Sequence, residues 1–346
     1  MKNILIITQK VDMNDSSFGF FHDWLREFSK LAQVTVLALE VGQYDLHGVK
    51  VFSLGKDKGV SKFFWLLNLY RYLWIHRKQY DFVFAHMSPL FVIFPFLLMF
   101  CLKKNIYLWY VHRKVDLKLR ISEKLVSKIF TATRESFGIK SDKVVYMGQA
   151  VDVDKFYSEN LEHLNDKKEF RVITVGRITS IKNLDTLIEA VALVSNEIPI
   201  IVDIVGAPVT KGDFEYEKRL KKMIIEGGLS SKIKFIGSVA NKDLPKLFTT
   251  ANASVNLCPT GGLDKAVLES MASGIPVLVS NTAFKAHLGQ YAEEFTFPER
   301  NPRALAERLK KLYVQKDLVE AGRYLQKLVR EKSSITNLIK SIVENL

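Results

Sequence analysis

Short hydrophobic runs alternate with longer amphipathic segments along the whole chain. The runs are rich in Ile, Val and Leu and are bounded by polar or glycine-containing stretches, which is typical of buried strands. Strands are predicted at residues 3–8, 34–39, 81–85, 107–111, 129–132, 144–147, 171–175, 200–205, 233–236, 255–257 and 277–279. Helical periodicity separates many of them, which favours an α/β protein with parallel sheets.

The first strand is followed by a polar loop and an amphipathic helix. Within that helix Phe20, Trp24, Leu25, Phe28 and Leu31 share one face at helical spacing. This β-α-β opening predicts a Rossmann-like domain, but it carries no G-x-G-x-x-G sequence, so a classical NAD-dependent dehydrogenase is not expected.

The loop at residues 15–19 follows the carboxyl end of the first strand, where doubly wound sheets bind ligands. Gly19 is therefore a candidate donor-binding residue. The alternative is that the loop is simply a connector.

Residues 253–281 predict a strand, a glycine loop, a helix and a second strand. The loop contains Gly261 and Gly262, Asp264 can cap the helix, and Gly274 suits the left-handed position that ends it. A loop at a helix N-terminus offers backbone N–H groups and a positive dipole to a phosphate. Glu269 lies roughly one and a half turns into the helix, within reach of the sugar of a bound nucleotide. An ordinary crossover with a solvated Glu is the alternative.

This stretch resembles the donor-site motif of the retaining glycosyltransferases of family 4 (glycosyl transferases group 1), which have the GT-B fold. In that family a Glu, seven residues and a second Glu precede a Gly-x-Pro. Glu269 to Pro276 match the second half, whereas Gly261 stands where the first Glu is expected. The resemblance implies donor-binding roles for a set of residues in this motif: Gly261, Gly262, Leu263, Asp264, Lys265 and Glu269. Asp264 or Lys265 is hypothesised to cover part of the role of the missing Glu.

Other segments carry the same resemblance. Arg177 and Lys182, five residues apart after a strand and Gly176, resemble the pair that grips the donor diphosphate. The family resemblance places the base near the backbone of Ser238 and Val239.

In the first domain, WYVHRK resembles the family segment in which a His contacts the donor sugar, and this implies that role for His112. His86, at the end of an earlier strand, is a weaker candidate. GQAVDVDKF at 148–156 resembles the closing phrase of the family's first domain.

Length and composition limit the number of domains, the redox compartment and the kinds of metal site. The length of 346 residues suggests two domains. The chain has two cysteines, Cys101 and Cys258, which are too few for a disulfide framework or a cysteine-rich metal site. This cysteine content fits a reducing compartment. The N-terminus predicts a strand rather than a signal peptide. No metal site is expected: Asp152 and Asp154 have Asp-x-Asp spacing but lie in the closing phrase of the first domain.

The formal net charge is +13, and residues 51–150 hold 17 Lys and Arg against 6 Asp and Glu. Residues 60–78 combine aromatic and basic side chains, with Phe63, Phe64, Leu67, Tyr70 and Trp74 on one side. This helix could lie on an anionic membrane; the alternative is a core helix with a basic edge. The apolar run at 90–102, interrupted by Pro95, is too short to span a bilayer, which takes about 20 residues. No nucleic-acid-binding signature is present.

Together these observations predict an α/β chain of GT-B type, with two Rossmann-like domains facing a central cleft. The expected domains are an acceptor-side domain at 1–160, a nucleotide-sugar donor domain at 161–332, and a last helix at 333–346 that crosses back to the first domain. The resemblance implies a metal-independent, cofactor-free hexosyltransferase that acts with retention. It would use a nucleoside-diphosphate sugar and a glycan or lipid-linked acceptor, in polysaccharide or glycolipid synthesis, peripherally at the cytoplasmic face of the cell membrane.

Two other classes stay open: a GT-B sugar-nucleotide epimerase or hydrolase, and a non-catalytic nucleotide-sugar-binding protein, which Gly261 would favour.

Overall fold

The structure is a computed structural model that describes residues 1–112, 114–166 and 168–346. The chain forms two compact α/β units. The first contains Met1–Gln149, Ala240–Lys242 and Ile335–Leu346, and the second contains Ala150–Val239 and Asp243–Ser334. The expected domain boundary at residue 160 therefore lies inside the second unit.

The first unit is built on a seven-stranded parallel sheet with the order β3-β2-β1-β4-β5-β6-β7. The strands are β1 Asn3–Val11, β2 Gln33–Val41, β3 Val49–Ser53, β4 Phe82–His86, β5 Ile106–Trp109, β6 Lys128–Thr131 and β7 Val144–Tyr146. The strand order reverses between β1 and β4, so their carboxyl ends form the topological switch point of this sheet.

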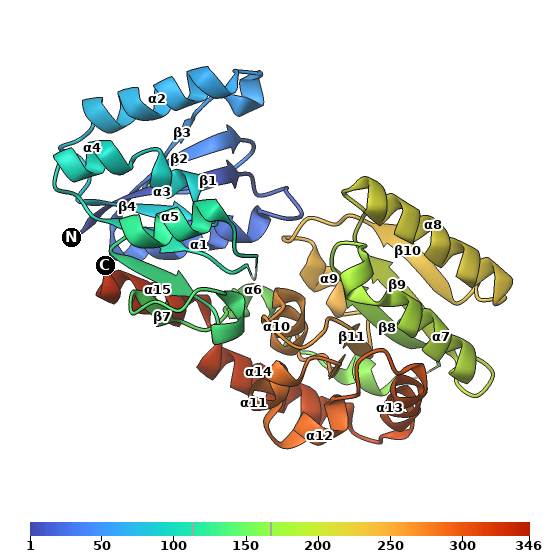
Figure 1. The fold of residues 1–346 in the computed structure, drawn as a ribbon. Helices are drawn as coiled ribbons and strands as arrows, with labels where there is room; N and C mark the ends of the chain where they lie inside the picture. The colour runs from blue at the N-terminus through green and yellow to red at the C-terminus, as the bar shows by residue number, and fades with distance from the viewer. Residues whose placement is uncertain (113, 167) are drawn as a thin grey trace. The chain divides into compact units, whose positions relative to one another are not determined.

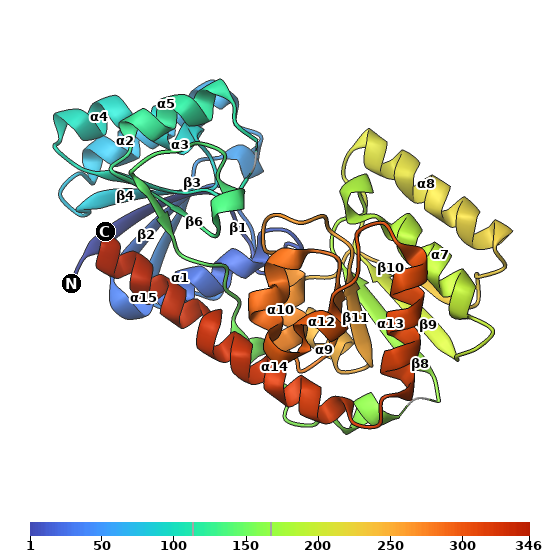
Figure 2. The same ribbon diagram turned by 60° about the horizontal axis from the view of Figure 1, so that its bottom comes forward.

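Helices cover both faces of the first sheet (Figures 1 and 2). One face carries α1 Gly19–Leu31 and α15 Ile335–Asn345, and the other carries α2 Lys62–Ile75, α3 Leu90–Ile93, α4 Phe96–Cys101 and α5 Leu117–Leu125. The apolar run at 90–102 is thus two short helices, because Pro95 separates α3 from α4.

The core face of α1 differs from the expected one at both ends of the helix. Trp24, Leu25 and Phe28 are buried as predicted, but Leu31 is 39% exposed. At the start of the helix Phe20 is only half-buried, and the neighbouring Phe21 is buried instead and packs against Trp24 and His86. Leu31 is the last residue of the helix, so the apolar face ends one turn earlier than the spacing suggested.

The last helix, α15, belongs to the first unit, although it follows the second unit in sequence. It packs on α1, and the Thr336 hydroxyl donates to a carboxylate oxygen of Glu27 over 3.0 Å. Lys2 Nζ donates to the Val343 and Leu346 carbonyls, and Lys128 Nζ to the Asn345 carbonyl. Both ends of the chain are therefore fixed to one unit.

The second unit contains a five-stranded parallel sheet with the order β10-β9-β8-β11-β12. Its strands are β8 Phe170–Val175, β9 Ile200–Val205, β10 Ile233–Gly237, β11 Ala253–Asn256 and β12 Val277–Val279. Here the order reverses between β8 and β11, which places a second switch point at the loops after these two strands.

The helices of the second unit surround this sheet (Figure 2). They are α6 Val153–Phe156, α7 Leu184–Val194, α8 Lys211–Glu226, α9 Leu244–Phe248, α10 Lys265–Ala272, α11 Lys285–Leu288, α12 Ala292–Phe295, α13 Pro302–Val314 and α14 Leu318–Lys332. Helix α7 packs against α8 and α13, whereas α10 packs against α6 and α14. Six short 3-10 turns complete the described elements: Lys56–Lys58, Arg134–Ser136, Glu162–Asn165, Ser180–Lys182, Thr282–Phe284 and Gly289–Tyr291.

Within the described residues, no helix has the length and apolar character needed to cross a bilayer.

Candidate functional site

The predicted donor residues of the second unit gather at the switch point of its sheet. Arg177 and Lys182 lie in the loop after β8, and the glycine loop with Asp264 follows β11. Ser238 and Val239 follow β10 at the same edge, because all five strands are parallel. The carboxyl edge of an open α/β sheet is where such folds bind ligands.

Two glycines let the backbone loops after β8 and β9 approach each other. Gly206 has φ +145°, and a Cβ there would lie 1.9 Å from the Gly176 carbonyl oxygen. Gly176 has φ +144°, and a Cβ there would lie 2.9 Å from Lys182 Nζ. A larger residue at Gly206 would displace the loop that carries Arg177 and Lys182, whereas one at Gly176 would displace the end of the Lys182 side chain.

Lys182 and Asp264 form an ion pair that joins the two loops of the switch point. Their side chains are 18% and 22% exposed, so the pair is mostly shielded from solvent. Asp264 also caps α10, because its Oδ1 accepts from the Ala266 N–H at 3.2 Å. The helix end and the lysine are therefore held by one carboxylate.

Two further side chains support this carboxylate. Asn256, buried at the end of β11, donates from Nδ2 to Asp264 Oδ2 at 2.9 Å. The Cys258 thiol lies 3.5 Å from the same oxygen. The sequence motif gave no signal for Asn256, because a buried Asn at a strand end is recognised only once its partner is known.

The protonation states of Asp264, Lys182 and Cys258 depend on one another. Burial opposes ionisation of Asp264, but the Lys182 ammonium and the donated hydrogen bonds outweigh it and lower the pKa of Asp264 to about 2. Burial likewise opposes protonation of Lys182, yet Asp264 raises its pKa above the ordinary value. Burial raises the pKa of Cys258 to about 11, so its thiol is protonated at neutral pH. The pair is thus fully ionised and has no net charge.

Arg177 differs from Lys182. Its side chain is exposed, and its guanidinium forms no ion pair with any residue that the structure describes. An unpaired guanidinium next to a glycine loop can bind a phosphate through two parallel N–H groups.

The glycine loop is fixed by a residue that the motif did not indicate. Asn281, fully buried after β12, accepts from the Gly261 N–H at 3.3 Å and donates to the Gly262 carbonyl at 3.0 Å. The Thr260 N–H is bound by a carboxylate oxygen of Glu299. Leu263 is buried below this loop, and Lys265 begins α10 with its side chain half-buried.

Glu269 is buried on α10, with only 5% of its surface exposed. A solvated helix residue, the alternative that local sequence left open, is therefore excluded. Helix α10 ends as predicted, since Gly274 has φ +77°.

The remaining predicted residues belong to the first unit. Gly19 begins α1, and its N–H donates to the Asp15 carbonyl at 2.9 Å. His112 follows β5 and forms an isolated parallel bridge with Phe137, next to the Tyr110 ring. Arg113, which follows it in the WYVHRK segment, lies outside the described residues.

His86, the weaker candidate for contact with the donor sugar, lies in the core of the first unit. It is fully buried, its Nδ1 lies 3.0 Å from the Thr8 hydroxyl, and its ring stacks on Phe21 at 3.7 Å.

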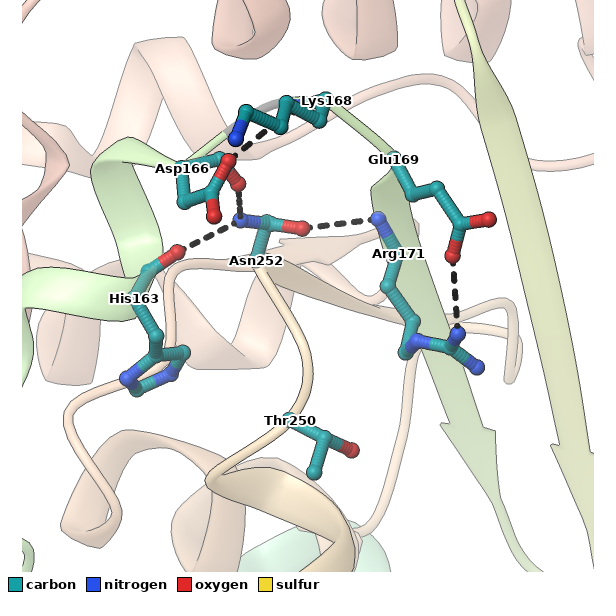
Figure 3. Close-up of a pocket in the computed structure, with 7 residues that line it drawn as sticks. All are labelled: His163, Asp166, Lys168, Glu169, Arg171, Thr250 and Asn252. Atoms are coloured by element: carbon teal, nitrogen blue, oxygen red, sulfur yellow. Dashed lines mark hydrogen bonds and ion pairs between the residues drawn. The ribbon is translucent and has the colours of Figure 1, made fainter.

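A separate hollow of about 320 Å³ lies before β8 and β11, at the opposite edge of the second sheet (Figure 3). Asn252 occupies its centre. Its Oδ1 accepts from the Arg171 N–H, and its Nδ2 donates to the carbonyls of His163, Leu164 and Asp166. These hydrogen bonds fix the segment before β8 to the sheet. We therefore assign Asn252 a structural role and do not include it in the donor site.

Over the residues that are described, no group of three or more His, Cys, Asp or Glu side chains is arranged to hold a metal ion.

Comparison with known proteins relates this site to a family. Residues 158–327 match the family model described as glycosyl transferases group 1. A GDP-mannose-dependent alpha-(1-6)-phosphatidylinositol monomannoside mannosyltransferase of Mycobacterium tuberculosis is 26% identical over 150 residues, which cover 40% of this chain and 38% of the relative. Mannosylfructose-phosphate synthase of Agrobacterium fabrum is 23% identical over 155 residues, covering 42% of this chain and 34% of that protein. The chain thus matches less than two fifths of the length of these curated relatives.

Solved structures match over nearly the whole chain. Anabaena HepE in complex with UDP-glucose has a TM-score of 0.77 at 16% identity and covers 99% of this chain and 98% of its own. Sucrose-phosphate synthase of Thermosynechococcus elongatus has a TM-score of 0.77 at 14% identity, covering 99% and 98%. At such low sequence identity, the structural similarity establishes the fold alone. The chain therefore has the GT-B fold, and residues 158–327, nearly all of which lie in its second unit, match the model of the glycosyl transferases group 1 family.

Proposed function

We propose that this protein transfers a hexose from a nucleoside-diphosphate sugar to a glycan or lipid-linked acceptor. The observation that carries the proposal is the convergence of Arg177, Lys182 and the N-terminus of α10 at one switch point, with Glu269 buried on the same helix. The similar proteins agree with it, because one is a GDP-mannose-dependent mannosyltransferase and HepE was solved with UDP-glucose.

In this proposal each part of the second unit has a separate task. Arg177 binds the diphosphate and stabilises the charge that the leaving group gains as the glycosidic bond breaks. Lys182 contributes a second cation, and the backbone at Gly261 and Gly262 faces phosphate or sugar. Glu269 accepts hydrogen bonds from the ribose hydroxyls. The base rests against the backbone of Ser238 and Val239.

The chemical step is proposed to retain the anomeric configuration. The bond between the anomeric carbon and the phosphate oxygen breaks, and the acceptor oxygen attacks the same face of the sugar. The acceptor's proton passes to the departing phosphate, so no protein nucleophile and no metal ion is needed. His112 donates a hydrogen bond to the sugar, and Gly19 contributes to donor binding.

The test is nucleotide binding followed by product analysis. A thermal-shift panel of UDP, GDP, ADP and their sugar conjugates, run on wild type, Arg177→Ala and Glu269→Ala, should identify one nucleotide whose stabilisation both variants lose. NMR of the product from that donor should show the donor's anomeric configuration. No stabilisation by any nucleotide, or an inverted product, would contradict the proposal.

A nucleotide-sugar-binding protein without transferase activity is the second candidate, because Gly261 removes the first Glu of the motif. Such a protein would bind the donor with the same dependence on Arg177 but release no nucleotide with any acceptor. A hydrolase or epimerase would instead release free sugar or an isomerised nucleotide sugar.

We further propose that the first unit binds an anionic membrane, with its acceptor in that membrane. Helix α2 exposes a run of large apolar side chains: Phe63, Phe64, Leu67, Tyr70, Trp74 and Ile75. On the same face of the sheet α4 exposes Leu97 and Phe100. Residues 62–80 contain four basic and no acidic side chains, so charge favours anionic lipid.

Vesicle flotation tests this surface. Wild type should float with vesicles containing phosphatidylglycerol at low salt and lose binding in high salt. Phe63→Ser combined with Phe64→Ser should weaken flotation, whereas Ile225→Ser and Val314→Ser, which change equally exposed apolar residues of the second unit, should not. Equal flotation of both double variants would exclude α2 as the binding surface.

A further inference from the structure

Lys182 already has an anionic partner inside the site that is proposed to bind a diphosphate. Its ammonium contacts Asp264 Oδ2, and its side chain lies across Gly176, where a Cβ would be 2.9 Å from Nζ. Both charges of the pair are mostly shielded from water. A diphosphate arriving at the loops after β8 and β11 therefore meets Lys182 as part of a neutral pair and not as an available cation.

The two partners differ in how firmly they are held. Asp264 is fixed by Asn256 Nδ2, the Cys258 thiol and the Ala266 N–H, all of which belong to β11, α10 or the loop between them. Lys182 has a long flexible stem, and its ammonium is held by Asp264 and by the neighbouring Cys258 side chain. When the pair separates, the lysine can move and the carboxylate stays.

We propose that Asp264 is the resident counter-ion of Lys182, which the donor diphosphate has to displace, and that this exchange sets the affinity for the diphosphate. The inference rests on the proposed donor site. On binding, the ammonium exchanges a carboxylate oxygen for phosphate oxygens, and no covalent bond forms or breaks. When the nucleoside diphosphate leaves after transfer, Asp264 takes the ammonium back.

The exchange gives Asp264 a role different from that of the missing Glu. While Lys182 is bound, Asp264 Oδ2 has three partners and Oδ1 caps the helix. The carboxylate has little capacity left to accept from sugar hydroxyls. It acts instead as a positioning residue that keeps Lys182 in the site and weakens the hold on product.

Asp264→Asn tests this role, because Asn keeps the size and the helix-capping ability but removes the charge. Isothermal titration with UDP and GDP should show about tenfold tighter binding of whichever diphosphate wild type binds, since a nearby anion has been removed. The gain should be smaller for UMP or GMP. In steady-state kinetics, kcat and the KM for the donor should both fall, because product leaves more slowly.

Glu189→Gln is the matched control, because Glu189 is an exposed acid in the middle of α7 whose side chain forms no ion pair with any residue that the structure describes. It should leave diphosphate affinity unchanged. Unchanged or weaker diphosphate binding by a folded Asp264→Asn protein would overturn the proposal.

A second measurement needs no nucleotide. Reductive methylation with formaldehyde and cyanoborohydride, read by mass spectrometry, should modify Lys182 at least about tenfold more slowly in wild type than in Asp264→Asn, because the ion pair keeps the amine protonated. The exposed Lys222 should react alike in both. Equal rates at Lys182 would overturn the pairing itself.

The two measurements separate the possible failures. If no diphosphate binds wild type or the variant, the proposed function is wrong and the exchange with it. If diphosphate binds both proteins equally while only the variant exposes Lys182 to methylation, the exchange alone is wrong.

Discussion

The two sheets have the same kind of switch point but fill it differently. In the first unit the ends of β1 and β4 are packed with aromatic rings, and His86 is buried against Phe21 with its Nδ1 near Thr8. In the second unit the ends of β8 and β11 carry glycines and the Lys182–Asp264 pair. Lys10, near the end of β1, also pairs with Asp15 at 2.7 Å, but that pair lies within β1 and the loop that follows it, whereas Lys182–Asp264 joins two loops. The same topology thus carries different residues at its two switch points, so function has to be argued from the residues and not from the fold.

The substitution with the largest expected effect on the second switch point is Gly206→Val. Its Cβ would meet the Gly176 carbonyl, and the residue would keep φ +145°, so we expect a loss of about 4 kcal/mol in the free energy of unfolding. Urea denaturation followed by circular dichroism measures it. Gly228→Ala, also at positive φ but with no neighbour within 4 Å, should cost only about 1 kcal/mol.

The corresponding change in the first unit is Phe21→Ala. Removal of a fully buried ring that stacks on His86 should lower the free energy of unfolding by about 3 kcal/mol. The proposed nucleotide affinity of the second unit should not change, which titration calorimetry can check. A matching loss of nucleotide affinity would show that the two switch points are not independent.

Arg177→Ala should separate function from stability. The side chain is exposed and forms no ion pair within the described parts of the chain, so the unfolding midpoint should stay within error. If Arg177 holds the leaving diphosphate, kcat/KM should fall about 100-fold. A fall of less than about threefold would assign the diphosphate to other residues.

The smallest expected effect is a pH dependence of stability. The folded pKa of Asp264 is about 2, below its ordinary value of 3.8, so its contribution is present above the ordinary value and is lost as pH falls toward 2. Between pH 5 and pH 3 it should account for about 1 kcal/mol of unfolding free energy. Asp264→Asn should flatten the pH profile by that amount, measured by urea denaturation at each pH.

Much of this fold was predictable because its strands are buried runs. The predicted ranges for β9 and β12 match the observed ones, and Asp264 and Gly274 mark the ends of α10 as expected. The edge strand β3 was missed because it alternates half-buried and exposed residues. Helix α8 was missed although Thr210 and Asp213 form a capping box at its start, a signal that the sequence did contain.

The site was predictable only where a local motif carries it. Spacing after β8 marked Arg177 and Lys182, and the helix signals marked Asp264. Asn256 and Asn281 could not be recognised, because their importance lies in hydrogen bonds to residues brought near by the sheet. The ion pair between Lys182 and Asp264 joins positions 82 residues apart, which no local pattern connects.

The protonated thiol beside the ion pair has a practical consequence for labelling. Cys101, at the end of α4, is exposed, whereas Cys258 is partly buried with a pKa raised to about 11. Because the thiolate is the reactive form, a maleimide dye at neutral pH should attach to Cys101 and spare Cys258. The natural sequence therefore provides a single fluorescent reporter on the helix layer that is proposed to meet the lipid, without any engineered cysteine.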